Sequence, residues 1–212
     1  MQSVQKDITF RDHTLVIGRT RTGKTYGVKN TLARMPEPVF FINTQYEDLL
    51  KYITATCNTS WNLIRKVLRN HELRGHNKIN YEPGNVPANR DQELTALITA
   101  MFKTTWPRRI YVVIDEVHLF KQKPLEQIQR IATGGLRYNI NGIFISQRPA
   151  LVDNTIMTQA QKFVIYKNSM EDDYLRRYGL PAEEIKNRLV NAPDYSYVEY
   201  DFIGVTGPFK VK

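Results

Sequence analysis

The sequence has few of the features that serve secreted or membrane-spanning proteins. Its single cysteine, Cys57, cannot form an internal disulfide, and no group of cysteine and histidine residues has the spacing of a zinc site. No stretch approaches the roughly 18 apolar residues that a membrane-spanning helix requires, and the first residues lack the apolar core of a signal peptide. We therefore expect no membrane insertion and a cytosolic location.

The sequence also lacks internal repeats and low-complexity linkers. Hydrophobic residues make up 42% of the 212 residues and charged residues 24%, proportions that exclude a disordered or collagen-like chain. A chain of this length can bury the core of one domain. We expect a single domain over residues 1–212, with its main body at about 14–179 and further helices and a hairpin at 180–212.

Acidic residues are in the minority. Lys and Arg together number 30 and Asp and Glu 21, which gives a formal net charge of +9 at pH 7. Such an excess of positive charge favours an anionic partner. Nucleic acid is the first candidate, ahead of a membrane surface, because no basic amphipathic anchor is evident in the sequence.

Short apolar runs rich in Val, Ile and Phe alternate with longer segments of helical periodicity. Parallel strands that are covered on both faces have this pattern, so the expected fold class is α/β, with a mainly parallel sheet and helices on both of its faces. The predicted strands are at 14–17, 39–42, 78–81, 109–114, 142–145 and 163–166. The predicted helices are at 24–34, 46–70 with a break at 57–60, 91–103, 125–132, 171–178 and 182–191. The alternation at 196–211 predicts a small C-terminal β hairpin.

A phosphate-binding loop is the most informative motif. Residues 18–25 read GRTRTGKT and match the pattern G-x-x-x-x-G-K-[ST], where a predicted strand ends and a predicted helix begins. The glycines let the backbone turn successive N–H groups toward phosphate oxygens, and the start of the helix adds partial positive charge. We expect Lys24 to reach the β- and γ-phosphates of a nucleotide and the hydroxyl of Thr25 to coordinate Mg²⁺. The predicted nucleotide-binding residues are Gly18, Arg19, Thr20, Arg21, Thr22, Gly23, Lys24, Thr25 and Tyr26.

Two adjacent carboxylates, Asp115 and Glu116, follow the apolar run at 110–114. Ligands of open α/β sheets bind at the carboxyl edge of the strands, where this pair is expected to lie. With a nucleotide there, Asp115 would hold Mg²⁺ partly through water, and Glu116 would orient or deprotonate the attacking water as a general base. On its own such a pair is also typical of a helix cap or a turn, but together with a P-loop it favours hydrolysis.

The predicted strand at 142–145 also ends in polar side chains. If this strand lies between the other two, Gln147 comes beside the γ-phosphate, where it would sense the phosphate or help to place the water. The alternative is that Ser146 and Gln147 form a turn that Pro149 fixes.

Three segments together resemble the HerA/FtsK superfamily of DNA-pumping ATPases: the P-loop, the strand that ends in Asp115 and Glu116, and the stretch 136–149. Within that superfamily the chain is most similar to the compact genome-packaging ATPases of tailless icosahedral viruses with internal membranes, which infect archaea or bacteria. The resemblance covers about 14–179; the P-loop is common to many families, and the stretch 136–149 is the more particular part. It implies a RecA-like P-loop NTPase fold with an additional strand.

The resemblance also implies a set of partners. Its members form homo-oligomeric rings, here a hexamer or a pentamer, with ATP and Mg²⁺ bound between neighbouring subunits. Double-stranded DNA passes through the centre without regard to its sequence, and a capsid vertex protein docks the ring. The implied location is the host cytoplasm or the virion.

In this superfamily an arginine from the adjacent subunit stabilises charge on the transferring phosphate. Arg137 matches the arginine that precedes the glutamine-bearing strand, and Arg130 and Arg148 are alternatives. Members often carry Asp-Pro and then a Glu after the second strand. This chain keeps Glu47 at the matching place and has Asn43 and Thr44 instead of the Asp and the Pro.

Basic residues gather in two places that are candidates for contact with DNA phosphates, which would make binding sensitive to salt. The first cluster is Arg65, Lys66, Arg69, Arg74 and Lys78, and the second is Lys121 and Lys123. Solvated helix faces are the alternative for both. The aromatic residues of the tail, Tyr195, Tyr197, Tyr200 and Phe202, would stack on bases or pack within the hairpin.

The sequence thus predicts a Mg²⁺-dependent ATPase that drives double-stranded DNA into a viral capsid, with Lys24, Glu116, Gln147 and Arg137 as its catalytic residues. Three alternatives stay open. They are a cellular DNA translocase of the same superfamily, a nucleotide or nucleoside kinase, and a nucleotide-gated module that assembles on DNA without pumping it.

Overall fold

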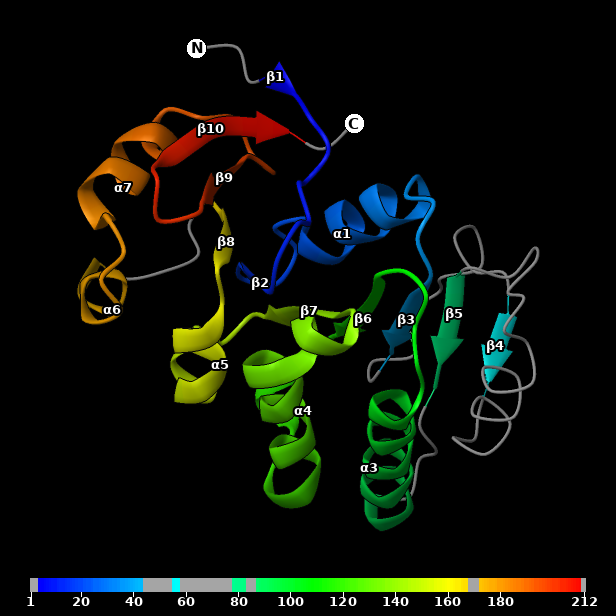
Figure 1. The fold of residues 1–212 in the computed structure, drawn as a ribbon. Coiled ribbons are helices and arrows are strands. Elements are labelled where there is room, and N and C mark those ends of the chain that lie inside the picture. Colours follow the sequence, from blue (N-terminus) through cyan, green and yellow to red (C-terminus); the bar gives the residue numbers. More distant parts are fainter. Residues whose placement is uncertain (1–3, 44–54, 58–77, 83–86, 168–171, 211–212) are drawn as a thin grey trace.

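The computed structural model of the chain describes residues 4–43, 55–57, 78–82, 87–167 and 172–210. These residues form a ten-stranded sheet in the order β1-β10-β9-β8-β2-β7-β6-β3-β5-β4 (Figure 1). The strands are β1 (Val4–Gln5), β2 (Thr14–Ile17), β3 (Val39–Ile42), β4 (Ala55–Cys57), β5 (Lys78–Tyr81), β6 (Ile110–Ile114), β7 (Ile140–Ser146), β8 (Lys162–Tyr166), β9 (Tyr197–Tyr200) and β10 (Val205–Lys210).

The sheet is parallel from β4 to β8 and becomes mixed beyond it. β9 runs antiparallel to β8, and β10 runs antiparallel to β9, so the expected C-terminal hairpin extends the sheet rather than lying apart from it. β2, β3, β6, β7 and β8 are buried along their whole length. Strands buried on both faces are apolar throughout, and for this reason the sequence showed them as apolar runs.

Helices cover both faces of the sheet, as expected, but unequally (Figure 1). The α-helices are α1 (Lys24–Ala33), α3 (Pro87–Lys103), α4 (Gln122–Gly134), α5 (Asn154–Gln159), α6 (Asp172–Arg177) and α7 (Ala182–Val190). Short 3-10 turns follow three of the elements: η2 (Val117–Leu119), η3 (Gly135–Tyr138) and η4 (Pro149–Leu151). Figure 1 shows α1 on one side of the sheet and α3, α4 and α5 on the other.

Each face of the sheet has its own apolar core because successive side chains of a strand point to opposite faces. On the face of α1, Val16 packs in one cluster with Val28 and Leu32 of that helix. On the opposite face, Leu15 and Ile17 belong to a larger cluster that includes residues of α3, α4 and α7. The P-loop strand β2 is therefore held from both sides.

Two elements differ from the sequence-based expectation. The described part of the segment 46–70 is β4, which pairs with β5 at the edge of the sheet. A helix at Ala55 and Thr56 is therefore wrong, whereas Cys57 belongs to the expected break; the rest of that segment lies outside the described residues. Pairing with a neighbouring strand decides the conformation there, and the spacing of apolar residues does not reveal it. The sequence also gave no sign of β1, which pairs in parallel with β10.

Glu199 fastens the N-terminal segment to the hairpin. Its buried carboxylate accepts hydrogen bonds from Lys162 Nζ at 2.9 Å, from Lys6 Nζ at 3.0 Å and from the backbone N–H of Thr9 at 2.9 Å. A buried carboxylate requires such partners, and these three come from two separate segments, the N-terminal segment and β8. The N-terminal segment, β8 and β9 thus form one unit beside the P-loop strand.

Candidate nucleotide-binding site

The order of the strands brings the three predicted site segments to one edge. β7 lies between β2 and β6, and its register pairs Ile17 with Ser146 and Ile114 with Phe144. All three strands are parallel, so the P-loop, the pair Asp115 and Glu116, and Gln147 leave the sheet at the same carboxyl edge. The sequence predicts Gln147 at the site only if its strand lies between the other two, and β7 has that central place.

The P-loop is shaped by its two glycines. A Cβ on Gly18 would lie 2.5 Å from Thr22 Oγ1 and 2.8 Å from Lys24 Cγ, so only glycine lets the loop close over this position. Gly23 has φ 91°, and the side chain of Thr22 fixes the turn by donating to the carbonyl of Arg19 at 2.8 Å. The result is a tight loop directly before the first turn of α1.

The start of α1 is suited to an anion. Its first turn carries no acidic side chain and its N-cap, Gly23, offers no side-chain oxygen to the first N–H groups. Lys24 is buried, and its Nζ donates to the carbonyl of Arg19 across the loop at 2.9 Å. Helix N–H groups, the helix dipole and a lysine ammonium together favour a phosphate.

The acidic pair is buried at the end of β6. Asp115 accepts a hydrogen bond from the backbone N–H of Glu116 at 3.0 Å, and Glu116 adopts a left-handed backbone conformation with φ 49°. Such a conformation is costly for a residue with a side chain and persists where the surroundings enforce it, commonly at functional sites. It turns the Glu116 carboxylate toward the end of the neighbouring strand β7.

Contacts from β7 and η2 hold the Glu116 carboxylate. Its Oε2 accepts the backbone N–H of Gln147 at 3.3 Å and lies 3.2 Å from Nδ1 of His118. Because Nδ1 lies so close to a carboxylate oxygen, we assign the ring proton to that nitrogen. Burial lowers the pKa of His118, and the positive charges of Arg148, Lys121 and Lys24 lower it further, so the ring is neutral at pH 7.

His118 also connects the acidic pair to the loop after β7. Its Nδ1 lies 3.1 Å from the hydroxyl of Ser146, which in turn accepts the backbone N–H of Arg148 at 3.0 Å. The sequence left the role of His118 open between a helix start and a functional residue. The one available signal was its position, two residues after Glu116.

Gln147 links the P-loop with the carboxylate. While its backbone N–H binds Glu116, its side-chain oxygen accepts a hydrogen bond from the hydroxyl of Thr20 in the P-loop. If a group on the nucleotide displaced Thr20 from this contact, Gln147 would move, and the Glu116 carboxylate that its backbone N–H binds would move with it.

The residues present fit a magnesium ion that is bound mainly by substrate. Among the described residues no three His, Cys, Asp or Glu side chains gather as a metal site. The predicted ligands, Thr25 and Asp115, are oxygen donors, and Thr25 stands in the first turn of α1. Mg²⁺ is bound by one or two protein oxygens together with phosphates and water, which is the donor set available here.

The three candidate arginines lie in different places. Arg137 is exposed on η3, before the amino end of β7, and so at the edge of the sheet opposite its own P-loop. Arg130 lies with its guanidinium 4.1 Å from the ring centre of Phe102 on α3, and Arg148 is exposed at the carboxyl edge beside Gln147. Arg137 therefore lies away from the P-loop of its own chain.

The basic clusters are only partly described. Lys78 is wrong as a candidate for DNA contact, because it is buried and its Nζ donates to the carbonyls of Met35 and Glu37 at 2.6 and 2.7 Å. Burial lowers its pKa to about 8. Lys121 and Lys123 are exposed, as expected, at the start of α4. Arg65, Lys66, Arg69 and Arg74 lie outside the described residues, as do Thr44 and Glu47.

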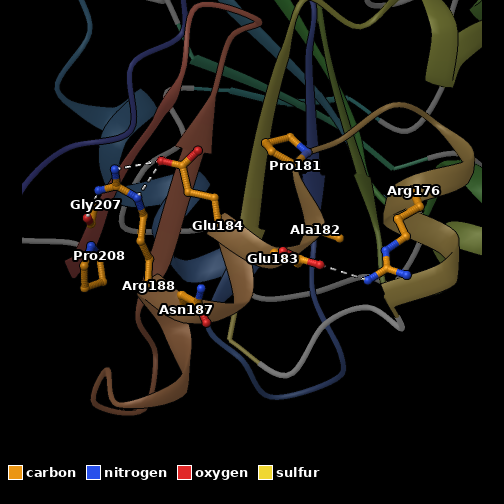
Figure 2. A pocket seen from close by; sticks show the side chains of 9 residues that line it. All are labelled: Arg176, Pro181, Ala182, Glu183, Glu184, Asn187, Arg188, Gly207 and Pro208. Atoms are coloured by element: carbon orange, nitrogen blue, oxygen red, sulfur yellow. Dashed lines mark hydrogen bonds and ion pairs between the residues drawn. The ribbon is translucent and has the colours of Figure 1, made fainter.

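A separate cavity of about 810 Å³ lies between α6, α7 and β10 (Figure 2). Figure 2 shows that its charged side chains pair with one another: Arg176 with Glu183, and Arg188 with Glu184. None of the predicted nucleotide-binding residues lines it. This cavity is therefore separate from the candidate nucleotide-binding site. No helix in the described part of the chain has the length and apolar character needed to cross a membrane.

Comparisons with known proteins show the family and the fold of the chain. Residues 9–149 match the AAA domain family, a span that contains the P-loop, the acidic pair and Gln147. No curated protein matches the chain.

Several solved structures share the fold. The genome packaging NTPase B204 from Sulfolobus turreted icosahedral virus 2 in complex with ATP-gammaS is 14% identical with a TM-score of 0.75, and the match covers 97% of this chain and 100% of that one. The DNA-packaging ATPase B204 from Sulfolobus turreted icosahedral virus is 15% identical with a TM-score of 0.69, covering 95% and 98%. EssC (ATPases 2 and 3) from Geobacillus thermodenitrificans is 10% identical with a TM-score of 0.55, covering 94% of this chain and 39% of EssC.

The matched span, the P-loop and the strand order lead to one assignment. The chain belongs to the AAA domain family and has the P-loop ATPase fold found in the viral packaging NTPases.

Proposed function

We propose that this protein is a Mg²⁺-dependent ATPase that moves double-stranded DNA into a viral capsid. One observation carries the hydrolytic part: β7 lies between the P-loop strand and the strand of the acidic pair, so that Gln147 contacts both Thr20 and Glu116. A loop for phosphates, a carboxylate for water and a residue between them are the parts that hydrolysis of a nucleoside triphosphate requires.

Each residue has a defined role in this proposal. The amides of the P-loop and Lys24 bind the β- and γ-phosphates. Thr25 and Asp115 would hold the magnesium ion, which would supply positive charge to neutralise the phosphates. Glu116 accepts a proton from the attacking water. His118 and the Gln147 amide fix the Glu116 carboxylate, so that it needs no reorganisation when water attacks.

The proposal includes an arginine from a neighbouring subunit. Arg137 is exposed at the edge of the sheet away from its own P-loop, so it would act only on a site in another chain. A ring of identical chains, each site lying between two of them, supplies such an arginine to every site.

The proposed movement of DNA is supported by charge and by similarity in fold. The formal net charge of +9 and the exposed Lys121 and Lys123 support a phosphate backbone as the partner. The full-length match in fold to the packaging NTPases supports the same partner, as those chains are of nearly the same extent. Contacts to phosphates alone would make binding independent of sequence and weaker in salt.

ATP hydrolysis by the purified chain tests the proposal. It is measured over a series of protein concentrations, with and without double-stranded DNA, at low and high salt. We expect the turnover per subunit to rise with protein concentration and with DNA, and the effect of DNA to vanish at high salt. Turnover that ignores protein concentration and DNA, and rises when a nucleoside is added, would instead identify a kinase.

A further inference from the structure

The strands on either side of the P-loop give a bound nucleotide a direction. On one side of β2 lies β7, followed by β6, and these strands carry Gln147, Glu116 and Asp115. The γ-phosphate must point toward that side, because the groups that activate water are there. The nucleoside end must therefore leave the P-loop on the other side, over β8 and β9.

Tyr195 lies on that other side. It precedes β9, whose Tyr197 pairs with Tyr166 at the carboxyl end of β8. A Cβ on Gly23, the last residue of the P-loop before α1, would lie 3.4 Å from Cδ1 and 3.8 Å from Cβ of Tyr195. The side chain of Tyr195 thus lies directly beside Gly23, in van der Waals range of the place that a Cβ would take there, although 172 positions separate the two residues in the sequence.

The ring of Tyr195 is not part of the core. The residue is 61% exposed, whereas Tyr197, two residues on, is fully buried and packs on the rings of Tyr166 and Phe209. Its backbone has φ 64°, a conformation that a bulky residue rarely adopts. An exposed aromatic ring held in a costly backbone conformation beside a binding loop is a feature expected of a ligand contact.

We propose that Tyr195 is the platform on which the nucleobase of the bound nucleotide stacks. The inference rests on the proposed binding of ATP at the P-loop, and it adds a binding residue for the nucleobase at the other end of the ligand. Stacking uses the face of the base and reads no hydrogen-bond pattern, so Tyr195 serves adenine and guanine alike. It adds affinity for the nucleoside part without touching the phosphates.

The variants are chosen so that folding does not obscure the result. Tyr195→Gly removes the ring and also relieves the backbone, since glycine adopts φ 64° freely. Tyr195→Trp keeps a stacking surface. Phe202→Gly is the matched control, because Phe202 is 58% exposed with φ 65° but follows the other end of β9.

Binding of ATP and of inorganic tripolyphosphate to the full chain is measured by calorimetry. We expect Tyr195→Gly to bind ATP and GTP about tenfold more weakly and tripolyphosphate as the wild type does, with affinity for ATP kept in Tyr195→Trp. Phe202→Gly should match the wild type for each ligand. Lys24→Ala should lose both ATP and tripolyphosphate.

Other outcomes overturn the inference in distinguishable ways. If Tyr195→Gly binds ATP as tightly as the wild type does, the base contacts something else while the P-loop assignment stands. If it loses tripolyphosphate as well, Tyr195 acts on the shape of the loop and not on the base. If the wild type binds neither ligand, the proposed function itself fails.

Discussion

Nδ1 of His118 lies 3.2 Å from Oε2 of Glu116 and 3.1 Å from the hydroxyl of Ser146. One buried ring nitrogen thus joins the carboxylate at the end of β6 to the last residue of β7. The backbone N–H of Arg148 binds the Ser146 hydroxyl, and the backbone N–H of Gln147 binds the Glu116 carboxylate. The side chains of Ser146 and Glu116 thus hold the loop after β7 next to the acidic pair. A displacement of this loop would reorient the carboxylate.

Replacing Glu116 tests the base directly. Glu116→Gln keeps the shape and the acceptor for Gln147 but cannot take a proton from water. We expect DNA-stimulated turnover to fall by about 10²- to 10⁴-fold, the usual contribution of a general base, while ATP still binds. Steady-state hydrolysis and equilibrium binding measure the two effects. Unchanged turnover would remove Glu116 from the mechanism.

Replacing His118 tests its role as a positioning residue. His118→Ala removes the side-chain donor to Glu116, and a hydrogen bond to a charged group is worth on the order of 1.5–3 kcal/mol, or about 10- to 100-fold in rate. We expect kcat to fall by roughly that factor with little change in KM for ATP, because the contact is to the base. His118→Asn, which again offers an N–H, should recover part of the rate. A rise in KM together with a fall in kcat that Asn does not reverse would indicate a structural role.

The sequence was sufficient for most of the sheet and for the core of the candidate site, for a physical reason. Buried parallel strands are apolar throughout, and the residue after each strand lies at one edge, so Asp115, Glu116 and Gln147 could be placed together from local patterns. What it missed depends on contacts between distant segments. Tyr195 beside Gly23 and the inward turn of Lys78 toward Met35 leave no local signal.

Replacing Gly18 tests whether the close packing of the P-loop is needed to bind ATP. In Gly18→Ala the new methyl group would lie 2.5 Å from Thr22 Oγ1 and 2.8 Å from Lys24 Cγ, so the lysine must move. We expect ATP affinity to fall about tenfold or more, since a charge-assisted contact to phosphate is lost, with the melting temperature little changed. Gly204→Ala is the control, because no atom lies within 4 Å of its added Cβ. Equal affinities in the two variants would contradict the role given to the loop.

His13 gives the fold a dependence on pH. Its Nδ1 accepts the backbone N–H of Gly142 at 2.9 Å. Burial lowers its pKa from 6.5 to about 4, the charge of Asp12 opposes this shift, and that of Arg109 adds to it. Between those two pH values the unfolded chain binds a proton on His13 that the folded chain does not. The contribution of His13 to the free energy of unfolding therefore declines as the pH falls from 6.5 toward 4.

Urea denaturation at pH 7 and pH 5 measures this dependence. In His13→Asn an amide oxygen replaces the nitrogen that accepts the Gly142 N–H, and the group no longer titrates. We expect the wild type to lose more stability than this variant between the two pH values. His118 titrates in both proteins, so its contribution cancels in the comparison. Equal losses would show that His13 is not held neutral by the fold.

The last prediction concerns the shared site. If Arg137 acts on the neighbouring subunit, Arg137→Ala chains and Glu116→Gln chains are each inactive in separate rings. In a mixed ring, some interfaces combine the intact Arg137 of a Glu116→Gln chain with the intact Glu116 of an Arg137→Ala chain.

Random mixing in equal amounts makes about a quarter of the interfaces complete, so we expect up to about a quarter of the wild-type turnover to return on mixing. An exchange period before the assay and a mixture of Lys24→Ala with Glu116→Gln are the controls. The second mixture has no complete site, because both substitutions fall on the P-loop side of the interface. If the Arg137→Ala mixture does not regain activity in rings shown to exchange subunits, a trans role for Arg137 is contradicted. The same experiment with Arg148→Ala would then test the alternative at the carboxyl edge.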